Sequence, residues 1–358
     1  MIKNNNEFNK NNFDDNFNNI KHINLQTICL KNIIIIIIIF LSLLNEIKNN
    51  KMENKYFFLK EIKNQKDKKL FFKDKILFYL SLRTRYLKSH NIIYNETNLI
   101  TFQQKVNWLL IHENPEYKSN IVDKIKLHDY SIKILGKDIC VPILKIYENE
   151  NDINLNELPN QFVLKLNHGS AMNIICTDKL KLNLKETIKK LKIWKNKNYG
   201  LWSTEFQYMY VKRKIYAEQF LSDDLIDYKV FCFNGKSKFI RIRKKLKYKN
   251  KIIKIHNHYD INWKLNNLES GLRGYIRKPD IKIKKPKNLD LMIKYANKLS
   301  EEFVFVRVDF YDFNNTIYLG ELTFTPSNSF IKWKNLEQNI YIGSFMDLSK
   351  IKKSFYNK

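Results

Sequence analysis

A hairpin of two alternating strands near the end of the chain constrains the fold more than any other feature. Residues 302–330 read EFVFVRVDFYDFNNTIYLGELTFTPSNSF, in which two alternating runs flank a polar turn. Asp309 lies on the first run and Glu321 on the second. Because successive side chains of a strand point to opposite faces, Arg307 shares the face of Asp309. The pattern predicts an antiparallel hairpin with a cation and two carboxylates on one face.

These charged side chains have two interpretations. Hairpins with one solvent-facing side commonly carry a charged pair, and such a pair requires no ligand. Burial of a cation and two carboxylates without a ligand would, however, be costly. Carboxylates on neighbouring strands also supply the hard oxygen ligands that Mg²⁺ prefers. The second interpretation is therefore a magnesium-nucleotide site at Asp309 and Glu321.

The composition narrows the class of partner only slightly. The 358 residues suffice for one large or two ordinary domains. The formal net charge is +28, but Asn, Lys and Ile are abundant throughout while Gly (8) and Pro (6) are scarce, which indicates a general compositional bias. The charge predicts attraction to anions, either a phosphate-rich substrate or an anionic membrane surface.

Cysteine and histidine usage gives no metal site. The cysteines form no CxxC pair, and three of them lie in apolar runs, which predicts buried thiols in a reducing cytosol: Cys29, Cys140, Cys176 and Cys232. His256 and His258 resemble a small metal pair, but no Cys or carboxylate cluster of metal-ligand spacing accompanies them, so we expect no metal there.

The first 51 residues form a low-complexity segment rich in Asn and Ile. Residues 1–27 are predicted to be disordered. The apolar run Ile33–Leu44 is shorter than the roughly 20 residues that span a bilayer, and no small-residue cleavage site follows it. The segment 1–51 is therefore either disordered or a short membrane anchor, unless it precedes a natural start at Met52.

Beyond this segment, helical and strand patterns alternate without a regular βαβ rhythm, which predicts the α+β class. Helical spacing predicts five helices: Leu70–Lys88, Thr101–His112, Ile121–Leu135 with Gly136 as its C-cap, Leu182–Lys197 and Leu289–Glu301. Strands are predicted for ICVPIL, QFVLKL, NIICT, KRKIYAEQFL, DYKVFCFNG and KSKFIRIRKK, with a loop over 147–160. Asn234-Gly235 predicts a two-residue hairpin turn.

One loop has the features of a phosphate-binding segment. The strand QFVLKL carries Lys165 and runs into His168, Gly169 and Ser170. A lysine near a strand end, followed by a turn with Gly and Ser, offers a cation and free backbone N–H groups, which phosphates require. The alternative is a strand lysine that faces solvent before a hairpin. Lys124, in VDK at the start of a predicted helix, is equally unspecific by itself.

In their order along the chain, these motifs resemble the ATP-grasp enzymes. More narrowly, TFQQKVNWLL, VDK, LPNQFVLKLNHGS, DYKVFCFNGK, FVRVDFY and GELTFTP resemble the TupA-like ATP-grasp family, named for teichuronopeptide synthesis, over roughly residues 76–348. The resemblance implies an ATP-grasp fold, in which two α+β subdomains hold ATP between antiparallel sheets. We expect a helical N-terminal region at 52–120, the ATP-grasp domain at 121–348 and a basic tail at 349–358.

The resemblance also implies a role for each motif residue. Lys124 and Lys165 would hold the ATP phosphates, and His168, Gly169, Ser170 and Ala171 would form a loop that closes over them. The segment Glu218–Leu221, with Glu218, Phe220 and Leu221, would receive adenine, while Asp227 and Lys229 would complete the nucleotide site. Mg²⁺ would be bound by Asp309, Glu321 and Thr323, with Arg307 and Lys165 as the catalytic residues.

The implied reaction is ATP-dependent ligation of a carboxylate to an amine through an acylphosphate, in which Mg²⁺, lysines and Arg307 neutralise charge. The acceptor would be a carboxylate of a cell-surface polysaccharide or its precursor, and the second substrate an amino acid or amine. The basic stretches Arg241–Lys251 and Arg273–Lys278 would either contact this anionic substrate or form a solvated face. The expected location is the cytoplasm, free or at the inner face of the membrane.

Three positions depart from the family pattern. Ala171 replaces a glycine of the phosphate loop, Thr323 replaces an asparagine metal ligand, and PSNSF lacks an expected glycine, so the sequence supports ATP binding better than turnover. Two alternatives are a glycosyltransferase that uses a nucleotide sugar and a basic RNA-binding module. RNA binding would leave the paired carboxylates unexplained, so we expect no nucleic-acid partner.

Overall fold

The computed structural model describes residues 98–358 except 204, 249–250, 273, 353–354 and 356–358. The predicted segment 1–51, the helix Leu70–Lys88 and Cys29 lie outside the described residues. The predicted boundaries at 52–120, 121–348 and 349–358 stay predictions. Within the part of the chain that is described, no helix is both long enough and apolar enough to cross a bilayer.

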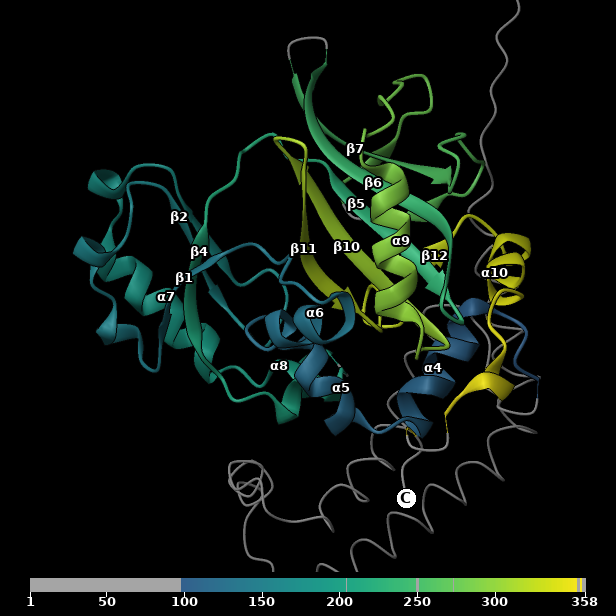
Figure 1. Cartoon of the computed structure of the whole chain (residues 1–358), viewed down its shortest axis with the longest axis horizontal. Coiled ribbons are helices and arrows are strands. Elements are labelled where there is room, and N and C mark those ends of the chain that lie inside the picture. The colour runs from purple at the N-terminus through teal and green to yellow at the C-terminus, as the bar shows by residue number, and fades with distance from the viewer. Residues whose placement is uncertain (1–97, 204, 249–250, 273, 353–354, 356–358) are drawn as a thin grey trace, which may run out of the picture. The chain divides into compact units, whose positions relative to one another are not determined.

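Seven helices and twelve strands make up the described part of the chain (Figure 1). The helices are α4 (Phe102–His112), α5 (Pro115–Val122), α6 (Leu127–Leu135), α7 (Leu184–Asn196), α8 (Tyr199–Ser203), α9 (Leu289–Ser300) and α10 (Leu336–Gly343). The strands are β1 (Ile143–Tyr147), β2 (Phe162–Leu166), β3 (Asn173–Cys176), β4 (Ile215–Gln219), β5 (Asp227–Phe233), β6 (Lys236–Tyr248), β7 (Lys251–Asp260), β8 (Ser270–Gly271), β9 (Ile276–Arg277), β10 (Phe305–Phe313), β11 (Thr316–Thr323) and β12 (Lys332–Trp333).

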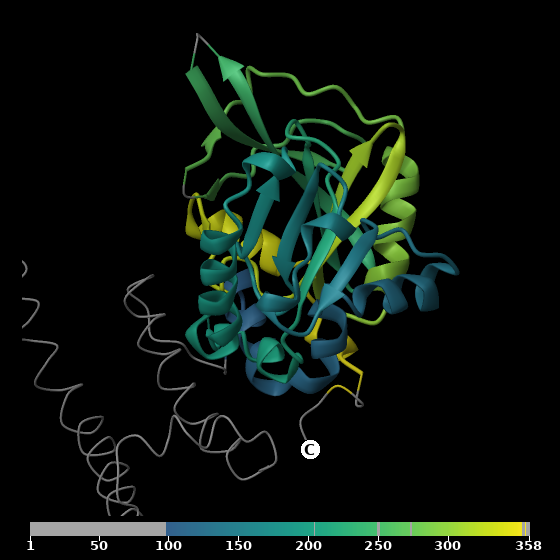
Figure 2. The same cartoon turned by 90° about the vertical axis from the view of Figure 1, so that its left-hand side faces the viewer.

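The strands form two main sheets, which confirms the predicted α+β class (Figures 1 and 2). The small sheet has the order β1-β4-β2-β3 and is antiparallel throughout. The large sheet has the order β11-β10-β5-β6-β7-β9, in which only β7 and β9 pair in parallel. Strands β8 and β12 form a separate pair. The chain passes from the small sheet to the large one between β4 and β5.

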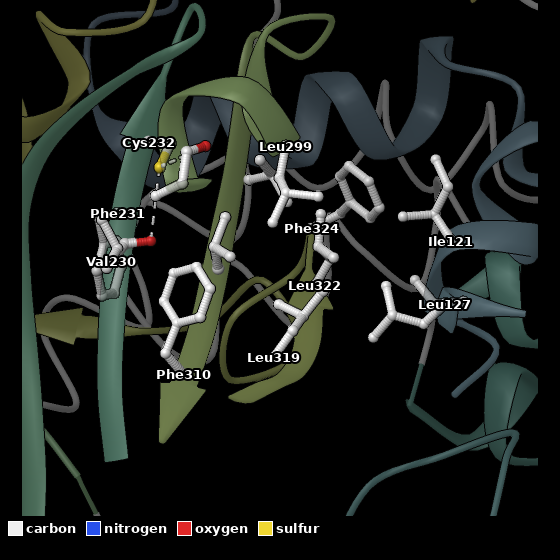
Figure 3. Packing of buried hydrophobic residues seen from close by; sticks show 14 of the residues in the cluster. Ile121, Leu127, Val230, Phe231, Cys232, Leu299, Phe310, Leu319, Leu322 and Phe324 are labelled. Atoms are coloured by element: carbon white, nitrogen blue, oxygen red, sulfur yellow. Dashed lines mark hydrogen bonds between the residues drawn. The ribbon is translucent and has the colours of Figure 1, made fainter. Parts of the chain in front are cut away.

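The two faces of the large sheet differ in polarity. Helix α9 covers one face, where alternate strand residues such as Val230, Cys232 and Phe310 join Leu299 of α9 in an apolar core (Figure 3). The thiol of Cys232 contacts two backbone carbonyl oxygens in this core. Because strand side chains alternate, the neighbouring positions face the other way, and many of these are charged. Cys140, Cys176 and Cys232 are all buried and unpaired, as predicted.

Most predicted elements are confirmed, with two corrections. The helix predicted over Ile121–Leu135 is interrupted after α5, because Oδ1 of Asp123 accepts a hydrogen bond from the backbone N–H of Ile125 at 2.9 Å and turns the chain. Gly136 (φ 74°) ends α6 as predicted. The strand predicted over ICVPIL begins only at Ile143. Besides β7, the elements α8, α10, β8, β9 and β12 were not predicted.

The hairpin turns follow their residue types. Asn234 (φ 48°) and Gly235 (φ 77°) both adopt the left-handed conformation that a two-residue turn requires, so the predicted turn between β5 and β6 is confirmed. Asn314 (φ 52°) and Asn315 (φ 58°) make the corresponding turn between β10 and β11. Both hairpins therefore have short, fixed connections, which set the register of the strands beyond them.

Candidate active site

The predicted hairpin aligns its charged side chains in register. Asp309 of β10 lies opposite Glu321 of β11, and Arg307 lies opposite Thr323. Directly opposed residues of an antiparallel pair share one face of the sheet. The prediction that both carboxylates and Arg307 meet on one face is therefore confirmed.

A bulge in β11 directs Glu321 toward this face. Asp309 pairs with Glu321, whereas the next residue, Phe310, pairs with Leu319, so Gly320 is an extra residue between them. Two residues two apart on a regular strand would share a face. Because of the bulge, Leu319 is instead buried with Phe310 in the apolar core while Glu321 remains with Asp309.

Arg307 and Lys229 bind Asp309 from two sides. Arg307 donates hydrogen bonds from Nε to Oδ1 and from Nη2 to Oδ2 of Asp309, both at 2.6 Å. The same Nη2 lies 3.0 Å from Glu321 Oε1 and 3.0 Å from Thr323 Oγ1. Lys229, the cross-strand partner of Asp309 on β5, donates to Oδ2. Two cations thus neutralise two carboxylates in one cluster.

The electrostatics of this cluster keep its charges in place. Burial by itself would raise the pKa of Asp309, but the neighbouring charges of Arg307 and Lys229 outweigh burial and hold this pKa well below its usual range. Burial likewise lowers the pKa of Arg307, and Asp309 more than offsets that effect. Both groups are ionised at neutral pH. Glu321, with a side chain 29% exposed, is the carboxylate that solvent reaches.

The small sheet contributes a second charged group. Lys165 of β2 and Glu218 of β4 lie on the same face and form an ion pair. Tyr216, the cross-strand partner of Lys165, is buried on the same face, and its hydroxyl interacts electrostatically with Glu218 and with Tyr311 and Glu321 of the large sheet. The face of the small sheet that carries Lys165 therefore lies toward the carboxylates of β11.

Lys124 connects the two groups. It lies in the turn between α5 and α6, and its Nζ donates to the backbone oxygen of Gly169 at 2.5 Å. Burial lowers the pKa of Lys124, Glu321 acts in the opposite direction, and the like charge of Lys165 lowers the pKa further. Lys124 thus lies near both Lys165 and Glu321, and the predicted phosphate lysines and metal carboxylates converge.

The predicted phosphate loop is anchored at its base by Asn167. Its Nδ2 donates to Asp123 Oδ1 and to the backbone oxygen of Lys212, both at 2.9 Å, and its Oδ1 accepts from the backbone N–H of Lys214 at 2.8 Å. Next to it, His168 is buried, and its pKa falls to about 4 because of burial and of nearby positive charges. His168 is therefore neutral at physiological pH.

The tip of the loop is exposed, whereas its start is tightly packed. A Cβ at Gly169 would lie 2.1 Å from Met172 Cε and 2.9 Å from Tyr199 Cγ, so this position requires glycine. Ser170 and Ala171 are exposed. Ala171 has φ 60°, in the left-handed region that favours glycine, which is the residue that the family pattern has at this position.

The predicted adenine segment lies at the passage between the sheets. Strand β4 ends at Gln219, and Phe220 and Leu221, both half-buried, begin the connection to β5. Asp227 opens β5, with Oδ2 3.6 Å from Arg243 Nε and 3.8 Å from Lys229 Nζ. The carboxylate of Asp227 therefore lies near two cations while its side chain stays 26% exposed, and its expected contact with the ribose hydroxyls of ATP stays a prediction.

The segment after β11 is conformationally unusual. Ser327 (φ 55°), Asn328 (φ 55°) and Ser329 (φ 65°) are three consecutive residues in the left-handed region. Such a conformation is costly for residues other than glycine. This is the PSNSF segment, in which a glycine was expected from the family pattern. The backbone here has a conformation that suits glycine, although none of these three residues is a glycine.

Sequence reasoning missed one buried acid beside the site. Glu205 is buried, accepts a hydrogen bond from the Thr325 hydroxyl and interacts electrostatically with Lys124 and Glu321. Burial raises the pKa of Glu205 to about 7. The stretch WSTEFQYMY around Glu205 carries no motif, so only the packing reveals this residue.

A small antiparallel sheet that carries Lys165 and a large sheet that carries paired carboxylates place the chain in the class of ATP-grasp proteins. The chain belongs to the TupA-like ATP-grasp family, whose model matches residues 104–346. The predicted family and fold are thus confirmed. A search of curated proteins gives no match.

Several solved structures are similar to this chain. D-alanyl-alanine synthetase A from Vibrio cholerae has 12% identity and a TM-score of 0.37, covering 61% of this chain and 60% of that one. D-alanine–D-alanine ligase from Bacillus anthracis complexed with ATP has 14% identity and a TM-score of 0.36, covering 64% and 65%. L-amino acid ligase from Bacillus licheniformis has 13% identity and a TM-score of 0.35, covering 57% and 44%. The matches therefore span less than two thirds of those proteins.

Proposed function

We propose that this protein joins a carboxylate to an amine at the expense of ATP. The observation that carries the proposal is the convergence of Lys124 and Lys165 with the carboxylates Asp309 and Glu321 between two sheets. Transfer of a phosphoryl group between anions needs charge neutralisation and positioning more than covalent help. This arrangement supplies both.

The lysines would bind the phosphates of ATP. Lys124 is buried among cations and carboxylates, with a lowered pKa, so an incoming phosphate would gain a partner that is already desolvated. Lys165 is paired with Glu218 and would bind phosphate from the small sheet. The exposed residues Ser170 and Ala171 would contribute free backbone N–H groups from the loop. Phe220 and Leu221 would contact the adenine.

The oxygen donors of the hairpin suit Mg²⁺. Asp309, Glu321 and the Thr323 hydroxyl offer hard oxygen ligands within one cluster, and Thr323 Oγ1 lies 3.2 Å from Glu321 Oε1. When bound, Mg²⁺ would neutralise phosphate charge. Because Arg307 and Lys229 already compensate both carboxylates, the site suits a metal that arrives with phosphates better than a bare ion.

Arg307 would act on the reacting acyl group. Its guanidinium is buried, fully ionised and held rigidly by Asp309, and its Nη2 is directed toward Glu321 and Thr323. A preorganised cation of this kind stabilises the negative charge that forms when an amine attacks an activated carboxyl. Loss of such a donor typically lowers turnover by a factor on the order of 10² to 10³.

The acceptor would be a carboxylate of a surface polysaccharide or its precursor, and the nucleophile an amine or amino acid. The family assignment and the net charge of +28 support an anionic acceptor. Unpaired buried thiols at Cys140, Cys176 and Cys232 agree with a reducing cytoplasm, where ATP is available. This proposal takes precedence over the glycosyltransferase and RNA-binding alternatives because the chain belongs to the ATP-grasp family.

The test is ADP release by the full chain with Mg·ATP and a panel of uronic acids and amines, with UDP-sugars as controls. We expect ADP release that requires both a carboxylate and an amine and that Arg307→Lys reduces by about 10² or more. Turnover of a UDP-sugar in place of ATP, or equal activity in Arg307→Lys, would refute the proposal.

A further inference from the structure

The charged row on the large sheet continues well beyond the metal-binding hairpin. From Asp309, the cross-strand register runs through Lys229 of β5 and Arg241 of β6 to His258 of β7. Directly opposed residues share a face, so all of these side chains lie on the face opposite α9. One pair further along, Arg243 lies opposite His256.

This extension of the row is basic and buried. Arg241 is 1% exposed, and His256 and His258 are 2% and 0% exposed. Arg277 of β9 lies beside His256 in the parallel pair β7–β9. Among the described residues, neither Arg241 nor Arg277 has a carboxylate within ion-pair distance. The sheet therefore buries these guanidinium groups without a direct ion pair, unlike Arg307 at Asp309, and Asp309 and Asp227 act on Arg241 only from a distance.

Several polar nitrogens of this cluster have no hydrogen-bond partner in the part of the chain that is described. Arg241 Nε, Arg277 Nε, His256 Nδ1 and Trp333 Nε1 are all buried without a partner. The guanidinium of Arg241 donates one hydrogen bond to a side chain, from Nη1 to Ser270 Oγ at 3.4 Å. Buried polar groups in native proteins are nearly always satisfied, and a cluster of unsatisfied ones requires an explanation such as a functional role, a water or an ion.

The protein itself does little to stabilise Arg241. Its guanidinium lies 5.4 Å from the ring centre of Phe231, which is one weak favourable contact. Burial and the like charges of Arg307 and Arg243 outweigh the opposing effect of Asp309 and Asp227 and lower its pKa to about 9. A buried cation without a partner costs several kcal/mol, which an apolar side chain would avoid. The residue therefore requires an explanation other than stability.

We propose that Arg241, His256, Arg277 and Trp333 form a subsite for an oxyanion, carboxylate or phosphate, of the acceptor substrate. An oxyanion would accept hydrogen bonds from the free donors and neutralise the positive charge of the guanidinium groups. Strands β8 and β12 cover the cluster through Ser270 and Trp333, while Arg277 remains half-buried at its rim. The subsite is thus formed within the fold rather than on its surface.

The position of the subsite specifies the class of acceptor, and this step rests on the proposed function. Arg241 lies two strands from Asp309, which corresponds to roughly 10 Å at the usual strand spacing. The reactive carboxylate would lie at Arg307. The acceptor would therefore carry a second anionic group on the order of 10 Å away, as do two neighbouring residues of an acidic glycan or a uronic acid that carries a phosphate.

The test compares one-anion and two-anion ligands by calorimetric titration of the full chain without nucleotide. The probes are galacturonate, digalacturonate and galacturonate 1-phosphate. We expect at least one two-anion probe to bind about tenfold or more tightly than galacturonate, and the better of the two identifies a carboxylate or a phosphate as the second anion. Arg241→Gln and Arg277→Gln should each bring this affinity down to that of galacturonate.

Lys244→Gln is the matched control, because Lys244 lies on β6 but on the other face and pairs with Asp224 at 3.3 Å. If Arg241→Gln fails to fold, Arg277→Gln at the rim decides the outcome. Equal affinity of the wild type for all probes, or unchanged affinity in a folded Arg277→Gln variant, would overturn the proposal. A separate titration with Mg²⁺ and a non-hydrolysable ATP analogue tests the nucleotide site, so failure of the proposed function is recognised independently.

Discussion

Lys229 and Asp309 are cross-strand neighbours on β5 and β10, and the lysine donates to the same carboxylate that Arg307 binds through two hydrogen bonds. Asp309 is therefore the most strongly neutralised acid of the site. Glu321, which is partly exposed, accepts a single hydrogen bond from Arg307, through Nη2. This asymmetry determines how each carboxylate responds to substitution.

Glu321→Gln should abolish the Mg²⁺ dependence of nucleotide binding while the protein stays folded, because the Glu321 side chain is 29% exposed and its loss leaves Arg307 paired with Asp309. Calorimetric titration with a non-hydrolysable ATP analogue, with and without Mg²⁺, measures this. Glu337→Gln on the exposed surface of α10 is the control. Full Mg²⁺-dependent affinity in Glu321→Gln would remove the metal assignment.

Asp309→Asn should also lose metal-dependent binding, but with a large loss of stability. It would leave Arg307 and Lys229 buried beside a neutral amide, and removing one partner of a buried ion pair typically costs about 3 to 5 kcal/mol. Urea denaturation of the wild type and both carboxylate variants compares the two positions. A similar, small loss for both would contradict the asymmetry described above.

Lys165→Ala should weaken the binding of ATP more than that of adenosine, because the proposed partner of Lys165 is phosphate. Competition titrations with ATP, ADP and adenosine give the three affinities. Lys145→Ala is a suitable control, since Lys145 lies on β1 of the same sheet and pairs with Glu157 at 3.1 Å. An equal loss for all three ligands would indicate that Lys165 acts through the fold.

Ala171→Gly should stabilise the protein by up to about 1 kcal/mol. Ala171 is exposed and has φ 60°, a conformation that costs an L-residue energy and glycine none. The midpoint of urea denaturation measures the change. Ala296→Gly, within α9, should act in the opposite direction and by a larger amount, because Ala296 is also fully buried. A destabilised Ala171→Gly variant would show that the gain in unfolded-state entropy exceeds the strain.

Glu205 should make stability depend on pH in an unusual direction. Its pKa is about 7 in the folded protein, against an ordinary 4.5, because of burial. Between pH 4.5 and 7 the folded state retains a proton that the unfolded state has lost, so stability falls as pH rises, by roughly 3 kcal/mol in total. When the pH is raised from 4.5 to 7, the free energy of unfolding of the wild type should fall by this amount relative to that of Glu205→Gln, as measured by urea denaturation. Parallel pH profiles would contradict the assignment.

Local patterns predicted the hairpins and most helices because those elements depend on neighbours in the sequence. The turn at Asn234 and the C-cap at Gly136 each follow from one residue type. The break before Lys124 did not, since it depends on a hydrogen bond that the Asp123 side chain accepts from the backbone N–H of Ile125 and that competes with the helix. Strand β7 was missed because its apolar start and its two histidines do not alternate as a half-exposed strand does.

The site was predictable to the extent that it follows strand alternation. The meeting of Arg307, Asp309 and Glu321 could be derived from spacing alone, although the bulge that makes it possible could not. The pairing of Lys229 with Asp309 and the burial of Arg241 depend on the order β10-β5-β6, which joins segments far apart in the chain. Glu205 carries no local signal, and its role arises entirely from packing.

The extra residue at Gly320 has a consequence for how this protein tolerates change. Removing this one glycine would leave a regular ladder in which Leu319 still lies opposite Phe310 and Glu321 still lies opposite Asp309, because adjacent strand residues alternate. Pairing every residue of β11 as a regular strand, with Gly320 kept, would instead turn Glu321 away from Asp309. An alignment that places a one-residue gap at Gly320 would therefore match Glu321 correctly in a relative without the bulge, whereas an alignment without that gap would not.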